Sequence, residues 1–160
     1  MWILTLGWAF FMPILSHINF ASTVWSGVSK NHLKKLNSLY RRGAKIILFG
    51  QPISTDLKMK QLGLLQLKQQ FDFNTAILVF KTQINKAPPY LSEFLLNPPA
   101  RYESNKYIVP RPRIDMYKSS FAFCGSSVWN NLPPKIRAVK SIGAFKNNLR
   151  KHLLSQNCTT

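Results

Sequence analysis

The sequence predicts a mainly α-helical fold with a short extended or β element near residues 107–123 and a C-terminal helix. Apolar residues recur at spacings of three and four over residues 30–49, 67–85 and 141–154, and this period is typical of amphipathic helices. Prolines interrupt the chain between these stretches. Because a proline disfavours the helical conformation in the residue before it, the Pro-rich segment 107–114 is expected to be extended.

The first of these stretches predicts the clearest helix. On a helical wheel at about 100° per residue, one narrow arc is apolar and consists of Leu33, Leu36, Tyr40, Ala44 and Ile47. Another side of the wheel collects six cations: Lys30, Lys34, Lys35, Arg41, Arg42 and Lys45. Gly50 and Pro52 are expected to end the helix.

The middle of the chain predicts one short and one long helix. Ser54 or Thr55 can cap the short helix, which is expected to end at Gly63. The long helix over 67–85 is apolar around about half of its wheel, which is typical of a largely buried helix. Pro88 and Pro89 are expected to end this helix, and a short amphipathic turn follows them.

The C-terminal part follows a polar, proline-bearing loop at 97–106, where we place a soft domain boundary. Ser119–Phe123 is a strand candidate, and residues 126–132 can form one or two helical turns. Ser141 is a good N-cap for a last helix that runs to about Leu154. The expected division is therefore an apolar segment, a helical region, a linker and a tail, at residues 1–15, 16–96, 97–106 and 107–160.

Residues 1–15 are almost wholly apolar, and the first charged side chain is Lys30. A buried helix is the first interpretation. A membrane span needs about 20 apolar residues, and this run is shorter and contains Pro13. A targeting segment and a misplaced start codon are the alternatives.

The charge balance points to an anionic partner. The chain carries 22 Lys and Arg against 5 Asp and Glu, a formal net charge of +17. Nucleic acid is the first expectation and an anionic membrane surface the second. The two cysteines, Cys124 and Cys158, form no CxxC pattern and no cluster with histidine. We therefore expect no zinc site, free thiols and a cytoplasmic or nuclear location.

The residues that catalysis would need are missing from the expected positions. A nucleotidyl transferase requires clustered carboxylates to hold two magnesium ions, but no two of the five acidic residues are adjacent or one apart. The three histidines are scattered, at 17, 32 and 152, and no P-loop or GxSxG motif occurs. Cys124 is expected to be a buried small apolar residue. We expect no catalytic residue, no metal ligand and no cofactor in this chain.

Basic clusters are the candidate binding residues, with a sequence-independent phosphate backbone as the expected ligand. The cationic side of the first helix and the basic segment around Pro112 are the two sites: Lys34, Lys35, Arg41, Arg42 and Lys45, and Arg111 with Arg113. A solvated charged face and a basic linker are the respective alternatives. A third basic cluster continues the pattern at Lys135, Arg137 and Lys140, followed by Lys146, Arg150 and Lys151.

The tail contains an ordered series of motifs. They are Pro110-Arg111-Pro112-Arg113, Ser119-Ser120-Phe121 with Gly125, Val128-Trp129-Asn130-Asn131-Leu132-Pro133-Pro134, Ile136-Arg137, and Ser141 with Phe145-Lys146. This series resembles the last segment of LINE-type (non-LTR) retrotransposon reverse transcriptases of the jockey-like group. Looser matches extend upstream to Pro13, at Ile18–Trp25, Leu36–Ile47, Leu62–Leu67 and Pro88–Leu91, whereas Met1–Phe11 does not fit.

The resemblance implies a helical, thumb-like bundle that follows the palm of an RNA-directed DNA polymerase. A thumb of this kind grips the RNA or DNA template–primer duplex through its backbone. The family's catalytic Tyr/Phe-x-Asp-Asp motif lies upstream of the matched region and is absent here. Magnesium would belong to the missing palm, so the fragment itself is expected to be inactive, with the missing palm and fingers as partners.

A shared hydrophobic core is our hypothesis for why the tail motifs occur in this order. Five residues are expected to form one small core: Trp129, Leu132, Ile136, Phe145 and Leu149.

The functional hypothesis is a truncated reverse-transcriptase fragment with residual nucleic-acid binding. A stand-alone nucleic-acid-binding module and a basic protein at a membrane surface are the alternatives, and we rank the membrane below nucleic acid.

Overall fold

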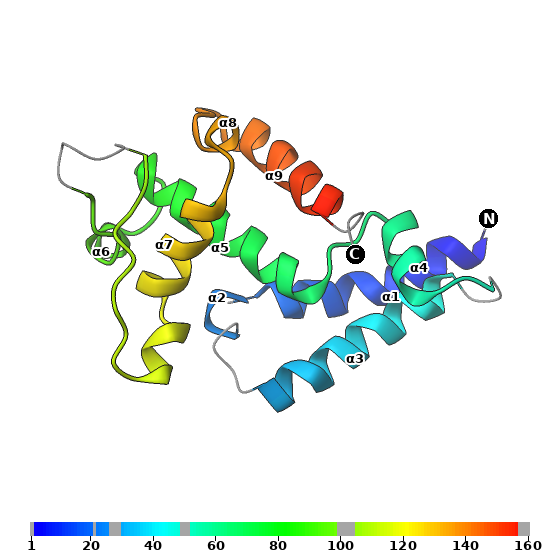
Figure 1. Ribbon diagram of the computed structural model, residues 1–160. Coiled ribbons are helices and arrows are strands. Elements are labelled where there is room, and N and C mark those ends of the chain that lie inside the picture. Colours follow the sequence, from blue (N-terminus) through cyan, green and yellow to red (C-terminus); the bar gives the residue numbers. More distant parts are fainter. Residues whose placement is uncertain (1, 21, 26–29, 49–51, 99–104, 157–160) are drawn as a thin grey trace.

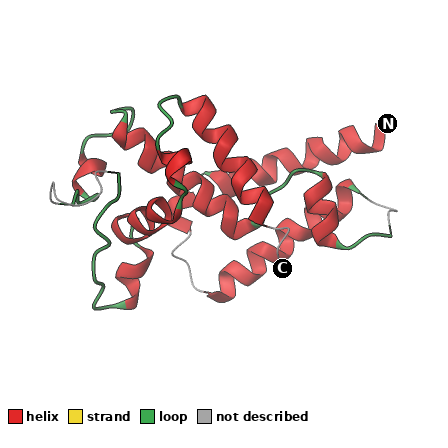
Figure 2. Ribbon diagram, turned by 45° about the horizontal axis from the view of Figure 1, so that its top comes forward, coloured by secondary structure: helices red, strands yellow, loops and turns green. Residues whose placement is uncertain are grey.

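The computed structural model describes residues 2–20, 22–25, 30–48, 52–98 and 105–156, which are mainly helical and contain no strand (Figure 2). Lys30 lies at the start of a helix, but its side chain falls outside the description, as do Gly50, Glu103 and Cys158. The elements are α1 (Trp2–Asn19), α2 (Ser22–Trp25), α3 (Lys30–Ile47), α4 (Thr55–Gln61), α5 (Leu67–Gln83), α6 (Tyr90–Glu93), the 3₁₀ helix η1 (Asp115–Ser119), α7 (Phe121–Asn131), α8 (Pro134–Arg137) and α9 (Ile142–Gln156).

Local signals set the ends of the short helix α4. The Ser54 hydroxyl accepts a hydrogen bond from the Leu57 N–H at 3.3 Å and so caps the first turn. Asp56 lies in that turn, where its charge favours the helix dipole. Gly63 follows the helix with a φ of +63°, which a glycine adopts at little energetic expense. The predicted start and end of this helix are therefore confirmed to within a residue or two.

Helix α5 is the centre of the fold (Figure 1). It packs against α7 and α9 on one side and contacts α1 and α2 on another. Two clusters of buried side chains meet along it. The first joins α1, α3 and α4 to the start of α5, and consists of Phe11, Ile18, Tyr40, Ala44, Ile47, Leu48, Met59, Leu64, Leu67 and Phe71.

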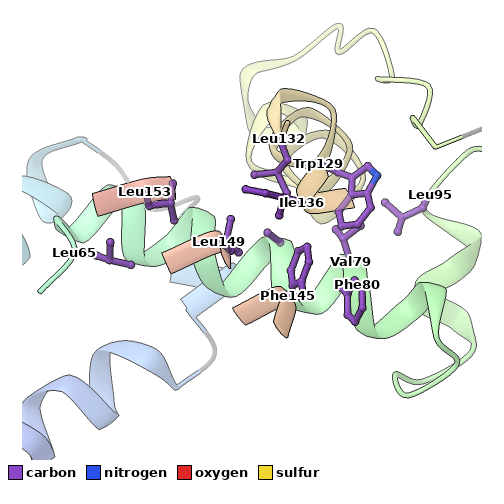
Figure 3. Close-up of a cluster of buried hydrophobic side chains, with 11 residues drawn as sticks. Leu65, Val79, Phe80, Leu95, Trp129, Leu132, Ile136, Phe145, Leu149 and Leu153 are labelled. Atoms are coloured by element: carbon purple, nitrogen blue, oxygen red, sulfur yellow. The ribbon is translucent and has the colours of Figure 1, made fainter. Parts of the chain in front are cut away.

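The second cluster joins α5 to the C-terminal helices (Figure 3). Phe145 is its centre: its ring stacks on Phe80, with centroids 4.3 Å apart, and on Trp129, with centroids 5.8 Å apart. All five residues expected to form a tail core belong to this cluster, so that prediction is confirmed. The members are Leu65, Ala76, Val79, Phe80, Leu95, Trp129, Leu132, Ile136, Phe145, Leu149 and Leu153.

Side chains from the tail motif bind the extended chain before η1. The Trp129 Nε1–H donates to the Asn105 carbonyl at 3.0 Å. Asn130 makes two bonds to Tyr107, because its amide oxygen accepts from the backbone N–H at 2.9 Å and its amide nitrogen donates to the carbonyl at 2.7 Å. Arg137 donates to the Asn105 carbonyl as well, at 2.5 Å. These bonds satisfy the Asn105 carbonyl and both backbone groups of Tyr107 without a strand partner.

Two expectations about this region require correction. The strand predicted for Ser119–Phe123 is wrong, because Ser120 caps α7 and its hydroxyl accepts from the Phe123 N–H. The helix therefore begins at Phe121 rather than near residue 126. Residues 107–114 are non-helical as expected, but they belong to no sheet within the described chain. The short β element near 107–123 is thus not confirmed.

The N-terminal apolar run belongs to α1, which contains Pro13. Phe11 and Ile18 of this helix are buried, whereas Met12 and Ile14 are exposed. Among the residues that the structure describes, no helix combines the length and the apolar character needed to cross a membrane.

The predicted domain boundary at 97–106 lies mostly outside the described residues and stays a prediction. Residues on both of its sides contribute to the second cluster, since Val79 and Leu95 pack there with Trp129. The helical region and the tail therefore share one core.

Candidate nucleic-acid interface

Helix α3 presents the exposed cationic surface of interest. Its apolar stripe packs on the first cluster: Leu33 and Leu36 are partly buried, and Tyr40, Ala44 and Ile47 are each no more than 1% exposed. The cations lie on another side of the helix and are exposed to solvent, because an amphipathic surface helix buries its apolar face and exposes its polar face. Four exposed cations of this helix make no hydrogen bond or ion pair within the described part of the chain: Lys34, Lys35, Arg42 and Lys45.

Two contacts fix the orientation of α3. The Tyr40 hydroxyl donates to the Leu65 carbonyl at 2.9 Å. Burial raises the pKa of this phenol to about 12, although the nearby charge of Arg150 lowers it. A Cβ atom on Gly43 would lie 2.5 Å from the Phe11 ring, so the absence of a side chain lets α1 pack closely on α3. The cations are therefore held on a rigid helix rather than on a loop.

Arg41 differs from the other predicted contact residues on α3. Its guanidinium binds the Asp56 carboxylate through two hydrogen bonds, at 2.7 and 3.0 Å. This bidentate geometry is the favoured arrangement for arginine and a carboxylate. Arg41 would have to leave Asp56 to contact a phosphate with both nitrogens, so we expect it to contribute less than Arg42.

The exposed side of α3 also holds apolar residues that the sequence reasoning did not single out. Leu39 is 57% exposed and Ile46 is 63% exposed. With Lys35 and Arg42 they alternate at spacings of four, three and four residues, so the four side chains lie along one line of the helix surface. The exposed Leu and Ile were visible on the wheel as positions outside the buried stripe.

Arg111 and Arg113 belong to a separate place in the fold. Both are exposed, in the non-helical segment between α6 and η1. The exposed apolar residues Ile114 and Met116 follow them. The structure thus brings the five predicted residues of α3 onto one helix and leaves the two arginines on another element.

The third basic cluster is divided by the structure. Arg137 is only 6% exposed, and its guanidinium donates to the backbone carbonyls of Leu132 and Asn105. Its inclusion among available cations was therefore wrong, since it stabilises the chain around α7. Arg150 donates to the Gly63 carbonyl at 2.8 Å, whereas the other four residues of the cluster are exposed: Lys135, Lys140, Lys146 and Lys151.

A groove of about 550 Å³ lies beside the cationic surface, between α3, α5 and α7. Lys34 of α3 and Lys68 of α5 belong to its lining, together with Asp72 and Cys124. Burial raises the pKa of the Asp72 carboxyl, and the charge of Lys68 opposes this rise. Burial also raises the pKa of the Cys124 thiol, and so does the charge of Asp72.

The sequence could not have indicated this groove, because its lining comes from three elements far apart in the chain. Cys124 was expected to be buried, but it is partly exposed and its thiol lies 3.1 Å from the Lys118 carbonyl. Within the described ranges, no three His, Cys, Asp or Glu side chains are grouped so that they could hold a metal ion.

Comparison with protein-family models, with curated proteins and with solved structures found no match for this chain.

Proposed function

We propose that this chain is a catalytically inactive C-terminal fragment of a LINE-type reverse transcriptase that retains sequence-independent binding to nucleic-acid backbones. Its ligand would be a duplex of the template–primer kind, and its fold would correspond to the thumb and the segment beyond it. The catalytic carboxylates and their magnesium ions would belong to the missing palm.

The observation that carries the binding proposal is the set of unpaired cations on α3. Lys34, Lys35, Arg42 and Lys45 are exposed on one rigid helix, and the nearby Asp56 is already occupied by Arg41. Self-repulsion among these charges is relieved when phosphates replace the surrounding counterions. Contacts to phosphates carry no sequence information, so the binding is expected to be independent of sequence.

The tail motif supports the family part of the proposal through its internal consistency. Trp129, Asn130 and Arg137 all bind backbone groups of residues 105–107. Leu132 and Ile136 lie in the same cluster as Trp129. A segment in which neighbouring residues serve one packing arrangement is a structural unit, and this gives a physical reason for the order of motifs on which the resemblance rests.

The test compares two variants that remove the same number of positive charges. In the first, Lys35, Arg42 and Lys45 of α3 are changed to glutamine; in the matched control, Lys86, Lys135 and Lys140 are changed. All six side chains are exposed, so both variants are expected to fold, which circular dichroism checks. Fluorescence anisotropy with a labelled 20-base-pair duplex then measures the affinity.

We expect the α3 variant to lose at least tenfold in affinity and the control to lose less than threefold. Equal losses would show that α3 contributes no more than exposed lysines elsewhere, and would refute a specific role for α3. No measurable binding by the unaltered protein at low salt would refute the binding proposal itself. Neither variant nor the unaltered protein is expected to extend a primer.

An anionic membrane surface is the second candidate, and the exposed Leu39 and Ile46 favour it. An interfacial helix uses aliphatic side chains flanked by cations. Flotation with vesicles of phosphatidylserine and phosphatidylcholine tests this candidate. Binding that is lost when Leu39 and Ile46 are changed to serine, with duplex affinity preserved, would favour the membrane over nucleic acid.

A further inference from the structure

The groove between α3, α5 and α7 combines three kinds of surface. Its apolar walls include Leu33, Phe71 and Val128. Its volume of about 550 Å³ falls within the range of roughly 300–1,000 Å³ that is usual for sites that bind small organic groups. An apolar cavity of this size is large enough for a flat ring and open enough to admit one from solvent.

Charged and polar groups make the groove unsuited to a purely apolar occupant. The acidic residue Asp72 and the polar residues Asn37 and Ser127 belong to its lining. A hydrocarbon chain would leave these groups desolvated without partners, which is unfavourable. An occupant with N–H donors on a flat ring would instead satisfy the Asp72 oxygens.

The two lysines of the groove provide its third kind of surface, which is positively charged. Lys34 is both a groove residue and one of the exposed cations of α3, and Lys68 lines the groove from α5. Both side chains are exposed. An anionic group attached to the ring would therefore meet positive charge next to the groove, and the groove is continuous with the surface proposed to bind phosphates.

We propose that the groove between α3, α5 and α7 accepts one unpaired nucleobase of a single strand, with its flanking phosphates on Lys34 and Lys68. This inference rests on the proposed function, because the strand must first be held by α3. A base with an exocyclic amine suits the site, since such an amine can donate to Asp72. The Phe71 and Phe123 rings, which also line the groove, supply apolar contact, as aromatic side chains do in other single-strand sites.

The experiment compares two 12-residue DNA strands with the same number of phosphates. One is oligodeoxyadenosine, and the other carries abasic sites throughout. The full chain is expected to bind the first about tenfold more tightly, because a base in contact with aromatic side chains adds affinity that an abasic site lacks. The duplex of the preceding section is measured beside them.

Filling the groove tests the location. Changing Ser127 to phenylalanine places a ring in the groove, and we expect the affinity ratio of the two strands to fall to about one. Changing Ser155 to phenylalanine on the exposed surface of α9 is the matched control, and the ratio should stay near ten. Circular dichroism establishes that both variants fold.

A second readout does not depend on filling the groove. In a Cys158→Ser background, iodoacetamide labels Cys124, and oligodeoxyadenosine should slow this labelling at least threefold more than the abasic strand does. In the unaltered chain, an affinity ratio of the two strands near one, together with equal rates of Cys124 labelling in the presence of either strand, would overturn the groove proposal even if both strands bind. A ratio that survives Ser127→Phe would also overturn it. Failure of the duplex and both strands to bind would overturn the proposed function, and the groove proposal with it.

Discussion

Replacing Trp129 tests how far the tail depends on one side chain. Trp129 is fully buried between Phe145 and Tyr107, with ring centroids 5.8 and 6.4 Å away. Truncating a buried tryptophan to alanine typically lowers the free energy of unfolding by about 3–5 kcal/mol. The lost hydrogen bond to the Asn105 carbonyl adds little, because Arg137 still donates to the same oxygen. We therefore expect Trp129→Ala to lower the free energy of unfolding by about 3–5 kcal/mol.

Trp129→Phe is a milder change at the same position. It keeps an aromatic ring beside Phe145 but removes the Nε1 donor and part of the ring volume. Because Arg137 still donates to the Asn105 carbonyl, most of the effect comes from the lost ring volume, and this variant should lose about 1–2 kcal/mol.

Urea titrations followed by circular dichroism at 222 nm measure both variants, since the helical signal does not depend on Trp129 itself. Small domains are stable by only about 5–15 kcal/mol, so Trp129→Phe also guards against complete unfolding of the alanine variant. A loss below about 1 kcal/mol for Trp129→Ala would refute the assignment of Trp129 to the centre of the core.

Three further predictions concern the N-terminal half and the groove. Because the folded pKa of Tyr40 is about 12 against an ordinary value of 10.0, its contribution to stability is fully present below pH 10 and is lost as the pH rises to 12. The unaltered chain should lose about 2 kcal/mol more than Tyr40→Phe over this window, which urea titrations at pH 9 and 12 would measure; parallel pH profiles would contradict the prediction. Gly43→Ala would ordinarily stabilise a helix by roughly 0.5–1 kcal/mol, but its Cβ would lie 2.5 Å from the buried Phe11 ring. We expect a net loss of about 1 kcal/mol or more in a thermal melt, and a gain would show that α1 does not pack there. The folded pKa of Asp72 is raised above 3.8, so its carboxylate destabilises the fold at neutral pH; Asp72→Asn should raise the melting temperature at pH 7, and the gain should shrink as the pH falls through the raised folded pKa toward 3.8. A lower melting temperature at pH 7 would count against this reasoning.

Periodicity predicted the long helices because their stabilisation comes from one buried face. The side of α3 that faces the first cluster consists of Leu33, Leu36, Tyr40, Ala44 and Ile47, as their spacing indicated. Residues of the tail core were also identified correctly, since the apolar positions of α9 and the motif around Trp129 share one small volume.

Predictions from the sequence were wrong where a side chain contacts residues that are distant in the sequence. Ser119–Phe123 has the composition of a strand, but Ser120 caps a helix and the following residues pack on α5. Arg137 looked like a solvent-exposed cation among lysines, but two backbone carbonyls bind it in the interior. Such partners depend on the tertiary fold and leave no periodic signal.

Part of the candidate site could also be predicted from the helical periodicity of α3. Exposure of Lys34, Lys35, Arg42 and Lys45 follows from the wheel, because the opposite side of α3 is buried. The pairing of Arg41 with Asp56 could not be foreseen, since α4 returns to α3 only in the folded chain. The groove likewise requires three elements to meet.

The salt dependence of duplex binding tests the central claim most directly. Each phosphate contact contributes about 0.9 to the slope of log affinity against log salt concentration. Changing Lys35, Arg42 and Lys45 to glutamine should therefore reduce the slope by about two to three, whereas the matched change of Lys86, Lys135 and Lys140 should reduce it by less than about one. Equal slopes for the two variants, or an α3 variant whose slope matches the unaltered chain, would contradict the proposal that α3 contacts the phosphate backbone.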